Sequence, residues 1–176
     1  MRKFLLLLLL LPFAGQAATL PAPTSTPCRD QKLGRALDFW IGDWTVTNAD
    51  GSKAGENRIE RLLDGCAVIE HWHGVDKGDD GLSLFTYDAV RHGWDQTWVT
   101  QDTSRPGGLK HKRLTLILHA GAARFEGTIV TPKGPLIDQT TLAPLDDGRV
   151  RQTIAWSRDN GRTWKTVFDA FYARKH

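Results

Sequence analysis

The chain has 176 residues, and its 23 lysine and arginine residues against 20 aspartate and glutamate residues give a formal net charge of +3. Arg2 and Lys3 lie in a segment that we expect to be removed, which leaves the mature chain near +1. So small an excess of positive charge, with no basic stripe, argues against nucleic-acid binding. The length of the chain suits one domain with a sizeable core.

The first 18 residues have the composition of a secretory signal peptide. Arg2 and Lys3 precede an apolar run over residues 4–11, and small residues follow, ending in Ala17 and Ala18. This pattern is typical of a cleaved signal, and the run is far shorter than the ~20 residues that span a bilayer. We therefore predict a signal peptide at 1–18, no membrane span after cleavage, and a periplasmic or secreted protein.

The next segment, residues 19–27, has the sequence TLPAPTSTP and predicts a flexible leader. The barrel domain is then expected over residues 28–176. It begins with Cys28, and the chain holds one other cysteine, Cys66. An even number of cysteines in an exported protein predicts one disulfide, with two buried thiols as the alternative.

One short helix is predicted over residues 30–39, with Asp30 as its N-cap. After Trp40 the chain alternates between turn residues and segments rich in valine, isoleucine, threonine and aromatic side chains. No gap there is long enough for a crossover helix, so neighbouring strands must be antiparallel. We predict strands at 43–49, 55–63, 66–75, 82–90, 94–102, 109–119, 124–131, 135–143, 148–157 and 164–173. An open meander of about ten strands would leave exposed edges, which an all-β, antiparallel up-and-down barrel avoids.

Several segments carry a family resemblance. They are DFWIGDW, GENRIERLLDGCAVIEHW, LFTYD with GWDQTWV, and NGRTWKTVFDAFY, which together cover most of the chain after the leader. The set resembles a family of uncharacterised secreted bacterial proteins with a lipocalin-like, or calycin, barrel. The resemblance implies a fold and carries no activity. Haem-binding nitrobindins are more distant in shape, and their haem-ligand context has no match here, so we expect no cofactor.

Near the start of the first strand, Trp40 or Trp44 is expected to plug the closed end of the barrel. Gly42 would then allow close backbone approach there.

Two further motifs suggest functions that we do not adopt. His71 and His73 share one strand face and match the first half of the cupin metal motif, but the acid that should follow is replaced by Lys77 or Gly78. We therefore expect no metal site.

Residues 157–164, SRDNGRTW, are similar to the Asp-box hairpin of sialidase propellers, yet one copy in so short a chain predicts only a structured turn.

Aromatic side chains on the central strands predict a small-molecule site. Trp94 and Trp98 share a face with Gln96 between them, and Glu70 and Trp72 share a face on a neighbouring strand. Polar groups beside aromatic rings describe many ligand pockets, whereas burying those polar groups unpaired in a filled core costs about 1–3 kcal/mol each. The predicted ligand-binding residues are Glu70, Trp72, Tyr87, Trp94, Gln96 and Trp98.

The favoured function is an exported barrel that binds a small, partly apolar ligand without catalysis. One alternative is a barrel enzyme, a hydrolase or isomerase with or without the help of a metal, for which Glu70, His71 and Asp95 are the first residues to test. The other is an envelope interaction or structural module with a filled barrel. The sequence names neither the ligand nor the oligomeric state, and it assigns no catalytic residue.

Overall fold

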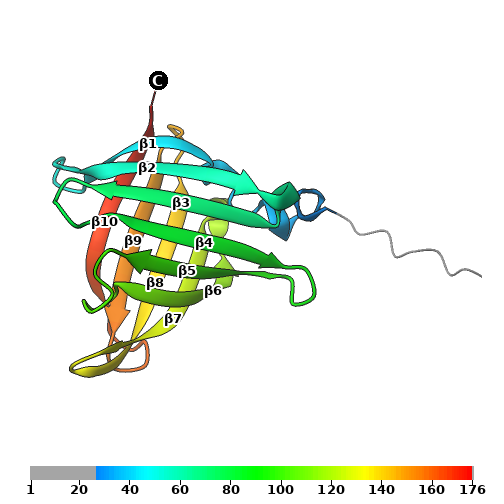
Figure 1. Ribbon diagram of the computed structural model, residues 1–176. Helices are drawn as coiled ribbons and strands as arrows, with labels where there is room; N and C mark the ends of the chain where they lie inside the picture. The colour runs from blue at the N-terminus through cyan, green and yellow to red at the C-terminus, as the bar shows by residue number, and fades with distance from the viewer. Residues whose placement is uncertain (1–26, 176) are drawn as a thin grey trace, which may run out of the picture.

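The computed structural model describes residues 27–175. The predicted signal peptide at 1–18 and all of the predicted leader except Pro27 lie outside the described residues. Ten strands form one closed barrel, and Figure 1 shows them running up and down around it. The strands are β1 (Gly42–Asn48), β2 (Lys53–Leu62), β3 (Ala67–Gly74), β4 (Gly81–Asp88), β5 (Gly93–Thr100), β6 (Leu109–Ile117), β7 (Ala123–Thr131), β8 (Gly134–Pro144), β9 (Val150–Ser157) and β10 (Lys165–Arg174).

The barrel closes through β1 and β10, which pair antiparallel with Val46 opposite Tyr172. Every other strand pairs antiparallel with its sequence neighbours. The predicted all-β, antiparallel up-and-down barrel is therefore confirmed, and each predicted strand overlaps one observed strand. Closure leaves no sheet edge within the described barrel, which is the physical reason that so many short strands form one stable domain.

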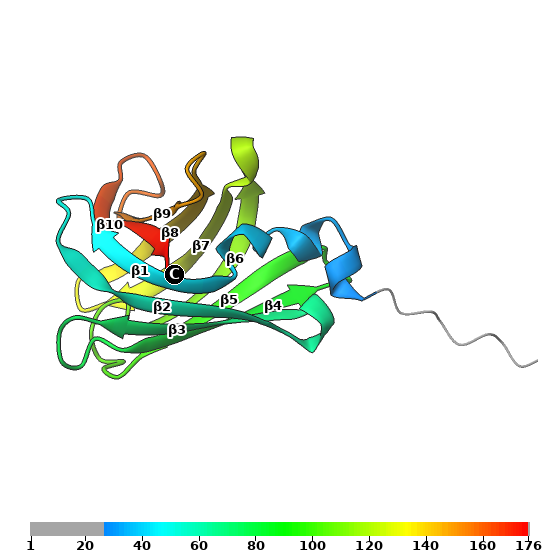
Figure 2. The ribbon, with the colours of Figure 1, turned by 90° about the horizontal axis from the view of Figure 1, so that it is seen from above.

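The short N-terminal helix takes the form of three 3₁₀ turns, η1 (Cys28–Asp30), η2 (Leu33–Arg35) and η3 (Asp38–Trp40). Asp30 lies inside η1, and none of these turns carries a side-chain cap hydrogen bond, so the predicted cap at Asp30 is wrong. The remaining 3₁₀ turns are η4 (Leu63–Gly65) and η5 (His119–Gly121). In Figures 1 and 2 the blue N-terminal turns lie at one end of the strands, which we call the closed end.

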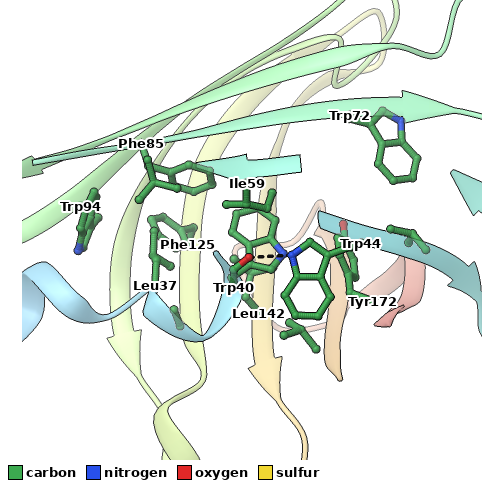
Figure 3. Close-up of a cluster of buried hydrophobic side chains, with 14 of the residues drawn as sticks. Leu37, Trp40, Trp44, Ile59, Trp72, Phe85, Trp94, Phe125, Leu142 and Tyr172 are labelled. Atoms are coloured by element: carbon green, nitrogen blue, oxygen red, sulfur yellow. Dashed lines mark hydrogen bonds between the residues drawn. The ribbon is translucent and has the colours of Figure 1, made fainter. Parts of the chain in front are cut away.

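The closed end is filled by apolar side chains, as the sequence predicted for Trp40 and Trp44. Both rings are fully buried, and Trp44 Nε1 donates to the Trp40 carbonyl oxygen at 2.9 Å, the dashed line of Figure 3. Trp40 meets Phe85 and Tyr172 edge to face, with ring centroids 5.6 and 6.1 Å apart. Such a filled layer leaves room for a cavity only toward the other end.

A disulfide between Cys28 and Cys66 ties the N-terminal turns to the start of β3, with Cα atoms 5.0 Å apart. The predicted pairing is confirmed. Next to it, Gly65 has a φ of +90°, and a Cβ there would lie 2.7 Å from the backbone nitrogen of Arg29. Glycine at this position lets the turn pack directly on the segment that carries Cys28.

The Asp-box-like hairpin between β9 and β10 is a turn held by its own side chains. Asp159 accepts hydrogen bonds from the backbone nitrogen of Thr163 at 2.9 Å and from the Ser157 hydroxyl at 2.8 Å. Gly161 has a φ of +82°, and Trp164 Nε1 donates to its carbonyl oxygen at 3.0 Å. The motif therefore closes a hairpin, because every bond named here lies within it.

We expect Asp159→Ala to lower the thermal unfolding midpoint by about 2–4 °C and to leave ligand affinity unchanged. The Thr163 hydrogen bonds hold the pKa of Asp159 to about 2. Because this pKa lies below that of an unfolded aspartate, the carboxylate stabilises the fold above about pH 4 and loses this effect as the pH falls toward 2. Thermal melts at pH 7, with Asp146→Ala in the exposed β8–β9 turn as the control, test the prediction. A large loss of binding at unchanged stability would instead place the hairpin in a site.

Candidate functional site

A cavity of about 170 Å³ lies inside the barrel, beyond the apolar layer of the closed end. It takes residues from strands all around the barrel and from the β3–β4 loop. Its lining is mixed, with aromatic and aliphatic groups beside buried charges. The lining residues are Glu70, Trp72, Asp79, Gln96, Trp98, Lys110, Lys112, Thr140, Gln152, Ile154, Phe168 and Tyr172.

Two tryptophans form much of the apolar wall, and glycines on the neighbouring strands make room for them. A Cβ on Gly55 would lie 2.7 Å from the ring of Trp72, and a Cβ on Gly81 would lie 2.4 Å from the ring of Trp98. Trp72 also meets Phe168 edge to face at 6.4 Å. These rings therefore approach the backbone at positions where a side chain would clash with them, so glycine is required there.

Glu70 is the centre of a buried hydrogen-bonded cluster on the adjacent wall. Asn57 Nδ2 donates to Glu70 Oε1 at 2.7 Å, and the Ser83 hydroxyl donates to Oε2 at 2.6 Å. Gln96 Nε2 in turn donates to the Ser83 oxygen at 3.0 Å, while Gln96 Oε1 has no partner among the described residues. Burial raises the pKa of Glu70, although these hydrogen bonds and the nearby lysines oppose that rise.

Opposite charges meet on the wall formed by the inner faces of β6 and β8, where two lysines share one carboxylate. Lys110 and Lys112 are the cross-strand neighbours of Trp98 and Gln96. Lys110 Nζ lies 3.0 Å from Asp138 Oδ2, and Lys112 contacts Oδ1 of the same side chain. Trp156 Nε1 donates to Asp138 Oδ2 at 2.7 Å, and Lys112 also bonds to Thr140. All three charged side chains are buried in the barrel interior.

The pKa values of Lys112 and Asp138 both fall below their ordinary values, for different reasons. Burial and the neighbouring Lys110 lower the pKa of Lys112 to about 8, against the favourable field of Asp138. Burial alone would raise the pKa of Asp138, but the two ammonium groups outweigh it and the pKa falls below its ordinary value. At neutral pH the wall therefore carries two ammonium groups and one carboxylate.

The loops at this end of the barrel lie close to the cavity. Asp79 in the β3–β4 loop lines it, and Arg105 in the β5–β6 loop lies 3.2 Å from the Asp79 carboxylate. A Cβ on Gly107 would lie 3.0 Å from the Lys110 side chain and 3.6 Å from the ring of Trp156. The β5–β6 loop therefore packs at Gly107 against the side chains of Lys110 and Trp156.

Four of the six predicted ligand residues come together at the cavity, namely Glu70, Trp72, Gln96 and Trp98. Tyr87 and Trp94 do not line it. Tyr87 donates to Gln31 Oε1 at 3.0 Å, and Trp94 Nε1 donates to the Leu33 carbonyl oxygen at 2.7 Å, so both hold the N-terminal turns. Figure 3 shows Trp72 and Trp94 at opposite ends of the aromatic cluster.

The two histidines of β3 point to the outside of the barrel, as the alternation with Glu70 and Trp72 predicted. His71 Nε2 lies 3.7 Å from Glu60, and His73 Nδ1 lies 3.3 Å from Asp80. Asp95 is also outside, 2.9 Å from Arg113. Of the three residues to test first in an enzyme, only Glu70 therefore faces the cavity. Within residues 27–175 no group of three or more histidine, cysteine, aspartate or glutamate side chains is placed to hold a metal ion.

Sequence reasoning missed the lysine wall. Lys110, Lys112 and Leu114 alternate along β6 and share its inner face, with Leu114 packed on the core. Because every second residue of a strand lies on the same face, the apolar Leu114 could have indicated that the two lysines point inward. Charged residues on a strand usually face water, however. Asp138 carries a weaker signal, since it lies between Leu136 and Leu142 on the inner face of β8.

The chain matches no family model, and no curated protein matches it. Among the helices of the described part of the chain, none combines the length and the apolar character that a membrane crossing requires. The fold and the cavity are thus the observations from which a function must be argued.

Proposed function

We propose that this protein binds a small, partly apolar molecule in the barrel cavity and performs no chemistry on it. The observation that carries the proposal is the cavity of about 170 Å³, lined by Trp72, Trp98 and Phe168 together with polar side chains. Concave sites with apolar walls and a few convergent polar groups are the usual form of small-molecule sites. The cavity is also the reason to favour binding over a structural module with a filled barrel.

The volume limits the size of the ligand. An engineered apolar cavity of about 150 Å³ in another protein holds benzene, so this cavity suits a molecule of one ring or a short branched chain. Haem and long fatty acids exceed it. Gln96 Oε1 is buried without a partner in the described residues, and a ligand hydroxyl or a water that donates to it would remove a cost of about 1–3 kcal/mol.

We also propose that the protein acts outside the cytoplasm, in the periplasm or after secretion. The disulfide between Cys28 and Cys66 supports this location, because such bonds persist in oxidising compartments. The signal-like first 18 residues and the resemblance to secreted bacterial barrels support it as well.

Ile154→Trp is expected to abolish binding, since the larger ring would occupy the cavity that Ile154 lines. The measurement is a screen of one-ring aromatic compounds and short branched acids by quenching of tryptophan emission. Val167→Trp is the matched control, because Val167 is a partly exposed residue of β10. Unchanged affinity in Ile154→Trp, or no compound that quenches the parent protein, would reject the proposal.

A barrel enzyme is the second candidate, and one observation favours it. Glu70 and Lys112 both line the cavity, and burial moves the pKa of each toward neutrality. Such pairs are typical of acid–base catalysis. Mass and NMR spectra of a ligand recovered from the protein distinguish the two functions. Chemical conversion of that ligand by the parent protein, lost in Glu70→Gln, would establish the enzyme.

A further inference from the structure

The lysine wall has more hydrogen-bond donors than the described barrel satisfies. Each lysine ammonium carries three N–H donors. Within residues 27–175, Lys110 contacts Asp138 and Lys112 contacts Asp138 and Thr140. Both lysines line the cavity. The donors that remain are therefore available to a molecule inside it.

The charges of this wall are also unbalanced. Within residues 27–175, Asp138 is the one carboxylate that contacts the two ammonium groups, and its side chain is fully buried. Glu70 is occupied elsewhere, since Asn57 and Ser83 bond to its two oxygens. The two ammonium groups therefore share a single carboxylate in direct contact, so the ion pairs of this wall leave one positive charge without a contacting partner. A buried charge without a partner is costly, and a bound anion would relieve that cost.

The apolar wall faces the same space. Trp72, Trp98 and Phe168 line the cavity together with the lysines, so one molecule of suitable size contacts both. We infer that the ligand is a small organic acid, with its carboxylate bound by Lys110 and Lys112 and its apolar body packed against Trp72, Trp98 and Phe168. This inference rests on the proposed function, and it adds the charge and the chemical class of the ligand.

Three probes of nearly the same shape and different charge test the inference. They are phenylacetate, its neutral amide phenylacetamide, and the 2-phenylethylammonium cation, each measured by titration calorimetry at pH 7. We expect phenylacetate to bind at least ten-fold more tightly than the amide and the cation not to bind. Equal affinity for acid and amide, or tighter binding of the cation, would overturn the anion inference and leave the proposed function standing. Failure of all three probes while toluene binds would do the same, whereas failure of all four would reject both.

Lys112→Met removes one ammonium and keeps an unbranched side chain of similar length. It should reduce phenylacetate affinity at least ten-fold and leave phenylacetamide affinity within about two-fold. Lys165→Met on the exposed surface of β10 is the control for a general change of charge. Lys110→Met provides a second variant if Lys112→Met fails to fold. Retained preference for the acid in a folded lysine variant would reject the assignment of these residues.

The pH dependence gives an independent readout. Phenylacetate stays ionised above pH 6, while Lys112, whose pKa is about 8, loses its proton above that value. The groups that face Lys112 are Lys110, Asp138, Glu70, Thr140 and Tyr172. Burial raises the pKa of Tyr172 well above its ordinary value. Affinity for phenylacetate should therefore fall as the pH rises through about 8, and affinity for the amide should stay constant. A flat profile for the acid between pH 7 and 9 would contradict the role of Lys112.

Discussion

Asp138→Asn should lower the free energy of unfolding by about 3–5 kcal/mol, the range found when one partner of a buried ion pair is removed. The asparagine keeps the shape of the side chain and can still accept a hydrogen bond from Trp156 Nε1. It removes the carboxylate that contacts both Lys110 and Lys112, and the two buried ammonium groups are left to repel each other. Urea unfolding followed by circular dichroism measures the loss.

The surface offers a matched control. Asp95 pairs with Arg113 at 2.9 Å on the outside of the barrel, and Asp95→Asn should cost at most about 1 kcal/mol because water already solvates both partners. The double variant Asp138→Asn, Lys110→Met removes the surplus ammonium and should recover much of the stability. Equal losses in Asp138→Asn and Asp95→Asn would show that the buried pair contributes no more than a surface pair.

The same variant has a pH dependence with a definite sign. In the parent protein the pKa of Lys112 is about 8 when folded and near 10.4 when unfolded, so the unfolded chain binds more protons between these values. This residue therefore destabilises the fold below pH 8, and the effect is relieved as the pH rises toward 10.4. Without Asp138 the folded pKa falls further, so the stability of Asp138→Asn should begin to recover at a lower pH.

Removing the disulfide is the second change with a large expected effect. The double variant Cys28→Ala, Cys66→Ala should lose about 3–4 kcal/mol of unfolding free energy, because the bond closes a loop with a sequence separation of 38 residues and restricts the unfolded chain. The loss should show first at the closed end, where the turns that carry Leu37 and Trp40 fill the barrel. Hydrogen exchange of the Gln31, Ala36 and Trp40 amides reports on those turns.

Two controls separate the bond from the side chains. Reduction of the parent protein should reproduce the loss without any substitution, and thiol labelling of the unreduced, denatured protein should find no free cysteine. Unchanged denaturation midpoints in both the reduced protein and the double variant would mean that the bond does not stabilise the fold. Protection that is lost throughout the barrel at once would mean that the closed end does not open by itself.

The strands and the barrel could be predicted from local features of the sequence. Turn residues such as Gly161 and Asp159 mark where the chain reverses, and the segments between them are too short for crossover helices. Alternation also predicted correctly that Glu70 and Trp72 face one way and His71 the other, because this property depends only on the two-residue period of a strand. The pairing of Cys28 with Cys66 needed only their number and the expected compartment.

Alternation determines the face of a residue, but it does not determine its depth in the barrel. Trp94 and Trp98 share a face of β5, yet Trp94 holds the N-terminal turns at the closed end and Trp98 lines the cavity. Likewise, Lys112 and Asp138 meet although β6 and β8 are separated by β7. The curvature of a closed barrel brings inner faces of non-neighbouring strands together, and pairing between neighbours carries no information about that distance. The sequence therefore determined the barrel and the inward wall of Glu70, Trp72, Gln96 and Trp98. Only the tertiary structure decided that Lys110 and Lys112, the cross-strand neighbours of Trp98 and Gln96, reach Asp138 of β8 around a cavity.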